Sequence, residues 1–209
     1  MKLAFIFILS YLIGGIPFSL LIGLVFGRVD IRKVGSKNIG STNLSRAIGF
    51  KWGLVGFLLD VLKGTTSVLF LPCLFGLAGS LPQVTAGVGA IIGHMLPIYL
   101  GFKGGKGVAT ALGVIVAVST IPALLCFGIF IIVVAITRYV SVGSITASTI
   151  LPIVFYLYSY LRKRPVELPT LILMVIIAIG VWITHRSNIK RLISGEEHKI
   201  GEKVGEKEG

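Results

Sequence analysis

The sequence predicts an all-α, polytopic integral membrane protein, and three observations support this prediction. First, 55% of the 209 residues are hydrophobic and only 13% are charged, whereas a soluble domain carries about 25% charged residues. Second, apolar runs of roughly 18 residues or more recur along the chain, and each is long enough for a membrane-spanning helix. Third, many of the basic residues behind the net charge of +12 lie in short loops between those runs, as in loops that face the cytoplasm.

One of the apolar stretches is ambiguous in length. Read as one helix, 108–137 would measure about 45 Å, well beyond a hydrocarbon core of about 30 Å. Broken near 119–122, it would form two short helices, with Pro122 in the first turn of the second helix and Ser119 or Thr120 as its cap. The first case gives six spans and the second gives seven, two of them short. The candidate spans are 3–27, 52–76, 83–101, 108–137, 140–161 and 166–184.

Charge orients the first half of the chain. Between Arg28 and Lys51 there are six basic residues and one acid, which predicts a cytoplasmic loop and an N-terminus outside. Charge does not orient the second half. With seven spans the basic cluster 162–164 lies outside, against the rule that basic loops favour the cytoplasm. With six spans that cluster lies inside, but the segment 185–209 lies outside. We favour seven spans and a cytoplasmic C-terminus, because only then do all the loops suited to phosphate lie on one face.

The loops between the spans are short, which predicts one transmembrane domain over residues 1–197. Residues 198–209 are polar and rich in Gly, Glu and Lys, so we expect a disordered tail there. Basic residues in loops between spans favour lipid headgroups or a phosphorylated substrate as partners, rather than nucleic acid. The two cysteines lie in apolar runs without other ligands nearby, so we expect no metal and no cofactor. The sequence leaves the oligomeric state open.

The loop 35–46, GSKNIGSTNLSR, is rich in hydroxyls and amides besides its basic residues. Hydroxyls, amides, backbone N–H groups and an arginine together can bind a phosphate. The competing interpretation is an ordinary solvated loop on the cytoplasmic side. The residues that make this loop a candidate site are Ser36, Lys37, Asn38, Ser41, Thr42, Asn43, Ser45 and Arg46.

The stretch 102–110, FKGGKGVAT, is a second candidate anion site. It departs from the Walker A spacing and from the dinucleotide fingerprint. Its lysine adds a full charge, its threonine a hydroxyl, and the helix that it opens presents N–H groups to an anion. The competing interpretation is a flexible turn between helices. The residues are Lys106 and Thr110, with Gly104, Gly105 and Gly107 to permit tight backbone.

The segment 185–197 follows the last span directly. His185, Asn188 and Arg191 can share one face of a helix. A basic helix that holds anionic lipid is the competing interpretation.

Three polar residues lie inside the apolar spans. Asp60 and Lys63 are one helical turn apart, and an ion pair satisfied within the bundle is as good an interpretation as a functional site. His94 fits a hydrogen-bonded histidine between helices. We therefore expect structural roles for all three.

Carboxylates are scarce where chemistry is expected. There is no acidic residue from Val61 to Val166, and neither His94 nor His185 begins an H-x-x-x-x-D sequence. An enzyme built this way would depend on positioning its substrates and on stabilising negative charge.

These residues resemble the bacterial acyl-phosphate-dependent glycerol-3-phosphate acyltransferases, the PlsY family, over roughly residues 1–197. The second signature is GGKGVAT at 104–110, preceded by GHMLP at 93–97. The first and third signatures appear as Ser36, Asn38, Gly40, Thr42, Asn43 and Arg46, and as His185, Asn188, Gly195 and Glu197.

The resemblance implies an enzyme in the bacterial cytoplasmic membrane, with seven spans and its signatures on the cytoplasmic side. It would transfer an acyl chain from acyl phosphate to the 1-hydroxyl of sn-glycerol 3-phosphate, which yields lysophosphatidate and phosphate. We expect the 35–46 loop to bind the acyl phosphate, the 104–110 loop to bind the phosphate of glycerol 3-phosphate, and Glu197 to pair with Arg186 or Arg191. The proton acceptor is either a phosphate oxygen of the substrate or His185.

We predict two groups of site residues from this resemblance. The predicted catalytic residues are Ser36, Asn38, Arg46, Lys106, His185 and Asn188. The predicted substrate-binding residues are Thr42, Asn43, Gly104, Gly105, Gly107, Thr110, Ser141 and Ser144. Two other functions stay open: a transporter of phosphate or an organophosphate with its site on broken helices, and a membrane scaffold that binds anionic lipid.

Overall fold

The computed structural model describes residues 1–202, which form helices, turns and loops without a strand. This confirms the all-α class. The α-helices are α1 (Lys2–Gly15), α2 (Phe18–Phe26), α3 (Ser41–Ile48), α4 (Phe50–Leu74), α5 (Ser80–Met95), α6 (Val108–Val118), α7 (Thr120–Thr137), α8 (Val140–Leu161), α9 (Leu168–Thr184) and α10 (Arg186–Ile193), with a 3-10 turn, η1 (Ile98–Leu100), after α5.

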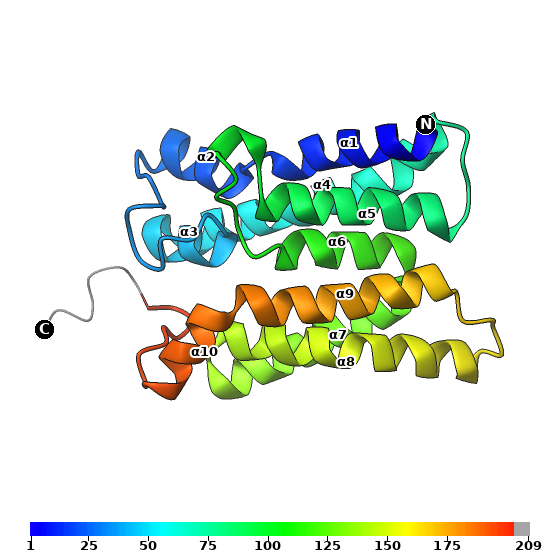
Figure 1. The fold of residues 1–209 in the computed structure, drawn as a ribbon. Coiled ribbons are helices and arrows are strands. Elements are labelled where there is room, and N and C mark those ends of the chain that lie inside the picture. The colour runs from blue at the N-terminus through cyan, green and yellow to red at the C-terminus, as the bar shows by residue number, and fades with distance from the viewer. Residues whose placement is uncertain (203–209) are drawn as a thin grey trace, which may run out of the picture.

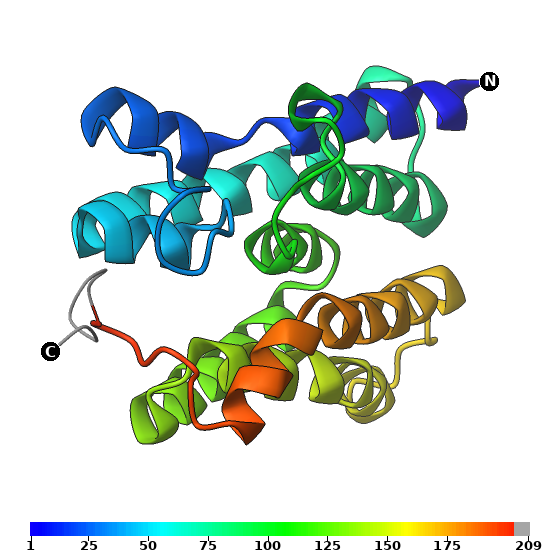
Figure 2. The same ribbon diagram turned by 60° about the vertical axis from the view of Figure 1, so that its left-hand side comes forward.

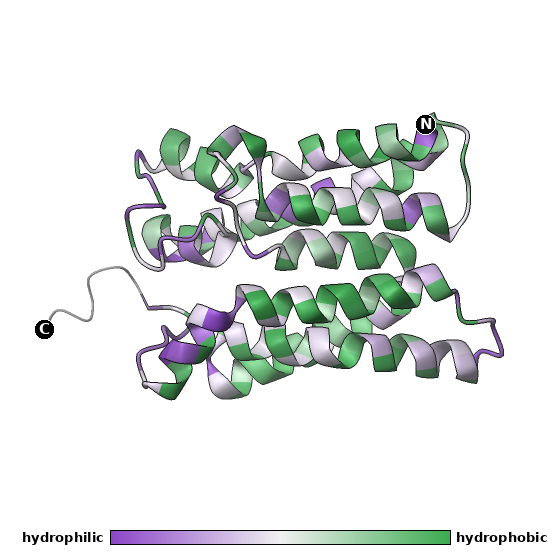
Figure 3. Cartoon of the chain, viewed as in Figure 1, coloured by the Kyte–Doolittle hydropathy of each residue, from purple (hydrophilic) through white to green (hydrophobic). Residues whose placement is uncertain are grey.

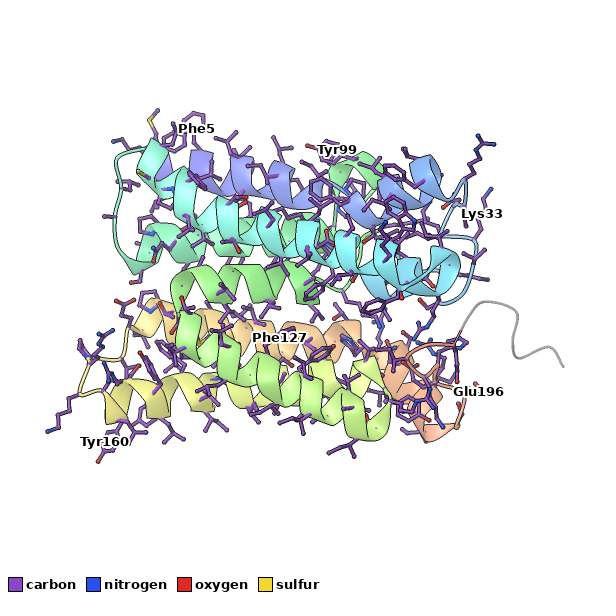
Figure 4. All side chains as sticks on the ribbon, turned by 180° about the vertical axis from the view of Figure 1, so that it is seen from behind. Phe5, Lys33, Tyr99, Phe127, Tyr160 and Glu196 are labelled. Atoms are coloured by element: carbon purple, nitrogen blue, oxygen red, sulfur yellow. The ribbon has the colours of Figure 1, made fainter. Side chains whose placement is uncertain are left out.

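The long helices run along one axis, and each long helix from α4 to α9 reverses the direction of the one before it (Figure 1). This alternation brings the connections 27–40, 101–107 and 138–139 to the same end of the bundle as α10. In the view from behind, Lys33 and Glu196 mark this end, and Phe5 and Tyr160 mark the opposite one (Figure 4). All the loops that the sequence singled out as suited to phosphate therefore share one end.

The stretch 108–137 consists of two helices, as the sequence analysis favoured. The break is at Ser119, whose φ of −152° and ψ of 81° end α6 and precede α7, and Pro122 lies in the first turn of α7. The 11 residues of α6 give a length of about 17 Å, roughly half of a hydrocarbon core.

Apolar helices long enough to cross a membrane dominate the part of the chain that the structure describes. Five pass by length and composition, and α9 joined to α10 makes a sixth, bent by 52°. Hydrophobic residues predominate along the helices, and hydrophilic residues gather mainly at the two ends of the bundle (Figure 3). These features fit an integral membrane protein. Seven spans and an N-terminus outside remain predictions.

Glycines let the helices of the first half pack backbone to backbone. A Cβ on Gly64 of α4 would overlap the carbonyl of Thr110 in α6, and a Cβ on Gly113 of α6 would overlap the carbonyl of Val61. Small residues at such crossings are typical of helix packing in membranes.

The first helices, α1 to α6, lie on one side of the molecule, and α7 to α10 lie on the other (Figure 2).

The beginning of the predicted tail contacts the bundle. The backbone N–H of Ile200 donates to the carbonyl of Arg138 at 2.7 Å, just after α7. Residues 203–209, the remainder of the predicted tail, lie outside the described residues.

Candidate active site

A cavity of about 140 Å³ lies at the end of the bundle where the predicted loops meet. Its walls come from both sides of the molecule: from α3, α4, α5 and the start of α6, and from α7, α8, α10 and the segment after it. The residues predicted from sequence that line it are Ser36, Asn38, Thr42, Asn43, Arg46, Asp60, His94, Lys106, Gly107, Ser141, Ser144, His185, Asn188 and Glu197.

Asn43 organises the 35–46 loop from within. Its side chain is 1% exposed, and its Nδ2 donates to the carbonyls of Ile31 (2.8 Å), Val34 (3.2 Å) and Asn38 (2.9 Å). Its Oδ1 accepts the backbone N–H of Ser36 at 3.0 Å. The sequence predicted Asn43 as a substrate ligand. In the structure its amide makes these four hydrogen bonds to backbone, which hold the loop in shape, and Asn43 also lines the cavity; its role as a ligand stays a prediction.

The N-terminus of α3 and one basic side chain face the cavity from this loop. Gly40, Ser41 and Thr42 line the cavity where α3 begins, so N–H groups of the first turn are available to an anion. From the last turn of α3, an Nη of Arg46 donates to the carbonyl of His198 at 3.3 Å. The Nε of Arg46 is buried and has no partner within residues 1–202.

The glycines of the second candidate loop serve different purposes. Gly107 has a φ of +79° and caps the N-terminus of α6 at the cavity wall, a conformation that glycine adopts at little cost. Gly104 and Gly105 do not line the cavity. A Cβ on Gly104 would overlap the carbonyl of His94, and a Cβ on Gly105 would overlap its ring. Close packing against α5 therefore explains these two glycines.

Lys106 joins the two sides of the cavity. Its Nζ donates to Oδ1 of Asn188 in α10. The Nδ2 of Asn188 donates to Oε1 of Glu197 at 2.6 Å, and Ser141 of α8 donates to the same oxygen at 2.9 Å. The Nε of Arg191 donates to Oε2 of Glu197 at 2.8 Å. The ion-pair partner of Glu197 is therefore Arg191, one of the two arginines that the sequence suggested.

Burial shifts the acid–base properties of the site. It lowers the pKa of Lys106 to about 8, against the opposing effect of the Glu197 carboxylate. Burial, helped by the charge of Lys106, lowers the pKa of His185 to about 4. The His185 ring is therefore neutral near pH 7, and its Nδ1 donates to the Val181 carbonyl at 2.8 Å. Burial acts to raise the pKa of Glu197, but hydrogen bonds from Asn188, Ser141 and Arg191 outweigh it and keep the pKa low.

Two of the remaining predicted residues, Thr110 and Lys63, lie behind the cavity wall, whereas Ser144 is part of the wall. Thr110 is fully buried and pairs with His94, at 3.2 Å between Oγ1 and Nδ1. Lys63 lies behind Asp60, with which it forms an ion pair. On the other side, the hydroxyl of Ser144 donates to the Val140 carbonyl of its own helix at 2.9 Å.

An apolar groove opens directly beside the polar cavity. It runs between α6, α7 and α8, and it shares Phe57, Val108, Phe130 and Ser144 with the cavity. Phe57 and Phe130 were not among the residues predicted from sequence. No signal could have found them, because an aromatic residue in an apolar span looks the same whether it faces lipid or a cavity. The part of the groove that does not border the cavity is lined by Ala111, Leu112, Ile115, Ala123, Cys126, Phe127, Ala147, Ser148, Leu151, Ile177 and Val181.

Comparison with known proteins identifies the family. The profile of the family described as glycerol-3-phosphate acyltransferase matches residues 4–195. The chain belongs to this family. The glycerol-3-phosphate acyltransferase of Leptospira borgpetersenii is 45% identical over 203 residues, which cover 94% of this chain and 91% of the relative. That of Aquifex aeolicus is 43% identical over 202 residues, which cover 96% and 100%.

Two crystal structures of PlsY, an integral membrane glycerol 3-phosphate acyltransferase, have the same fold. The glycerol 3-phosphate form superposes with a TM-score of 0.84 at 39% identity and covers 96% of each chain. The lysophosphatidic acid form gives a TM-score of 0.82 with the same identity and coverage. This chain is therefore a membrane acyltransferase of the glycerol-3-phosphate acyltransferase family, and the resemblance stated from the sequence is confirmed.

Within residues 1–202, no group of three or more His, Cys, Asp or Glu could hold a metal ion.

Proposed function

We propose that the protein transfers a fatty acyl chain from acyl phosphate to the 1-hydroxyl of sn-glycerol 3-phosphate, giving lysophosphatidate and phosphate. The observation that carries this proposal is the convergence of two helix N-termini, those of α3 and α6, on one cavity with Arg46 and Lys106. Each N-terminus paired with a cation suits one phosphate group. The apolar groove beside them suits the acyl chain.

The proposal divides the cavity between the two substrates. Ser36, Asn38 and Arg46 bind and polarise the acyl phosphate. Lys106, with the N-terminus of α6, binds the phosphate of glycerol 3-phosphate. His185 and Asn188 orient the attacking hydroxyl. Supporting roles fall to the other predicted residues: Thr42, Ser141 and Ser144 as further hydroxyls, and Asn43, Gly104, Gly105, Thr110 and Glu197 as the residues that shape the loops.

At the acyl carbonyl carbon, the reaction forms one bond and breaks one. The 1-hydroxyl oxygen attacks the acyl carbonyl carbon, the bond from that carbon to the phosphate oxygen breaks, and phosphate leaves. The hydroxyl proton needs an acceptor. With a pKa of about 4, His185 is a weak base, whereas a phosphate monoester has a second pKa near about 6. A substrate phosphate oxygen is therefore the stronger base by roughly two units, and we assign the proton to it.

In this proposal the site lies on the cytoplasmic face of the bacterial inner membrane. The chain crosses the membrane seven times, with the N-terminus outside and the C-terminus inside. The basic loop 28–51 favours the cytoplasm, and residues within 36–46 of this loop line the cavity, which supports a cytoplasmic site. A reporter fused after residue 200 should be cytoplasmic. A reporter at that position found outside would contradict this topology.

The donor test decides the reaction. Purified protein in detergent is mixed with glycerol 3-phosphate and either acyl phosphate or acyl-CoA of the same chain length, and lysophosphatidate is measured. We expect product from acyl phosphate alone, with loss of turnover in Ser36→Ala and Arg46→Ala. Product from acyl-CoA alone would overturn the proposed donor. The absence of product in detergent, combined with uptake of glycerol 3-phosphate into proteoliposomes, would favour a transporter.

A further inference from the structure

Two charged side chains are buried inside α4, where the sequence predicts a membrane span. Lys63 is 3% exposed and Asp60 is 2% exposed, and 2.8 Å separates Nζ of Lys63 from Oδ1 of Asp60. Two well-packed apolar side chains are often as stable as a buried ion pair, because both charges must leave water. Stability alone is thus a weak reason for this pair, and its contacts on either side suggest another.

On one side, the pair is tied to the break in the first span. Nζ of Lys63 donates to the carbonyl of Ile16 at 2.9 Å. Ile16 is the C-cap of α1, and Pro17 separates it from α2. Lys63 thereby connects α4 to the break between α1 and α2.

On the other side, the pair reaches the loop that carries Lys106. Nδ1 of His94 lies 3.6 Å from Oδ1 of Asp60 and 3.2 Å from Oγ1 of Thr110, in the first turn of α6. The carbonyl of His94 accepts the backbone N–H of Gly105 at 3.1 Å, and the His94 ring fills the space where a side chain at Gly105 would lie. His94 therefore contacts the chain on both sides of Lys106, at Gly105 and at Thr110.

We propose that Lys63, Asp60 and His94 are positioning residues for Lys106. They form a polar chain from the break in the first span to the 104–110 loop, and this chain fixes where the Lys106 ammonium enters the cavity. The inference rests on the proposed role of Lys106 in binding the phosphate of glycerol 3-phosphate. It predicts that damage to the polar chain raises KM for glycerol 3-phosphate more than it lowers kcat.

Two substitutions of His94 separate the polar contact from the packing of the ring. His94→Phe keeps a ring against Gly105 and loses Nδ1, whereas His94→Asn keeps a polar atom near the Nδ1 position and loses the ring. We expect His94→Phe to raise KM for glycerol 3-phosphate about tenfold, the upper end of the effect of one lost hydrogen bond, here that between Nδ1 and Oγ1 of Thr110. We expect His94→Asn to stay within about twofold of the native value. The reverse order would overturn the proposal.

Removing both charges of the ion pair tests the same proposal without leaving one buried charge unpaired. The comparison is Lys63→Met alone, which leaves Asp60 charged and unpaired and should lower the melting temperature. Asp60→Asn with Lys63→Met removes both charges and should recover the melting temperature. If the pair only stabilises the fold, this double variant will also recover KM. Our proposal requires KM for glycerol 3-phosphate to stay raised, and a native KM in the folded double variant would overturn it.

Two controls complete the experiment. Thr65→Val removes a hydrogen bond from α4 to the Gly113 carbonyl of α6, 2.9 Å long, that is not part of the polar chain, so it should leave KM unchanged. In a Lys106→Ala background, His94→Phe should raise KM no further, because the polar chain acts through Lys106; a further tenfold rise would overturn the proposal. If the native protein makes no lysophosphatidate, the proposed function fails. If the native protein is active and KM is unchanged in both His94→Phe and the double variant, only this inference fails.

Discussion

The lowered pKa of Lys106 predicts a pH limit on the use of glycerol 3-phosphate. Burial brings this pKa from the ordinary 10.5 to about 8. The ammonium that would bind the phosphate is therefore present below about pH 8 and lost above it. Because kcat/KM reports groups of the free enzyme, kcat/KM for glycerol 3-phosphate should fall as pH rises through this value.

The size of the effect follows from the same value. One unit above its pKa, about one-tenth of a lysine is protonated, so kcat/KM at about pH 9 should be roughly tenfold below its plateau near pH 7. The phosphate of the substrate is already a dianion over this range, since its second pKa is near about 6. In Lys106→Arg the side chain stays charged beyond about pH 12, so the fall should disappear even if the plateau is lower.

The assay measures initial rates of lysophosphatidate formation in detergent, at saturating acyl phosphate and constant ionic strength, for the native protein and Lys106→Arg in parallel. A native profile that stays flat to about pH 9.5 would contradict the predicted pKa of about 8. A fall with the same midpoint in both proteins would assign the titration to another group, and Lys106 would not be the phosphate ligand.

Three further predictions concern the roles of single residues. Asn43→Ala leaves three backbone carbonyls without their side-chain donor, so it should destabilise the protein by about 1–3 kcal/mol or more, whereas Thr42→Ala should leave the melting temperature unchanged. Gly105→Ala forces a methyl group into the His94 ring and should raise KM for glycerol 3-phosphate without affecting that for acyl phosphate; equal changes in both would contradict it. Ala123→Leu narrows the part of the apolar groove that does not border the cavity, so activity should fall with hexadecanoyl phosphate and persist with octanoyl phosphate, and an equal loss with both would refute the assignment of the groove.

The sequence predicted many of the residues that line the cavity, but not what each of them contacts. Residues such as Ser36, Arg46 and Lys106 do line one cavity. Hydroxyls and cations in short segments between apolar spans stay at the end of the bundle, because placing them in the hydrocarbon core costs free energy. Asn43 was predicted as a ligand, and its amide makes hydrogen bonds to the backbone of residues 31–38, so it also shapes the loop. A sequence cannot separate these cases, since an amide in a polar loop looks alike whether it points inward or toward a substrate.

The sequence by itself determined the class of molecule. Long apolar runs must form helices in a bilayer, because backbone polar groups have no other partners there. Pro122, with Ser119 or Thr120 as a cap, marked where 108–137 could break but left one helix or two open, and the structure has the break at Ser119.

Only the tertiary structure decided which residues meet. Asp60 and His94 are far apart in the chain and lie 3.6 Å apart in the bundle, and Phe57 and Phe130 join the polar cavity to the apolar groove. Hydrophobicity, which specifies the spans, is nearly uniform around long apolar helices such as α1, α4 and α7. The face that a helix turns inward is therefore set by packing, here by glycines such as Gly64 and Gly113 that let α4 and α6 approach closely.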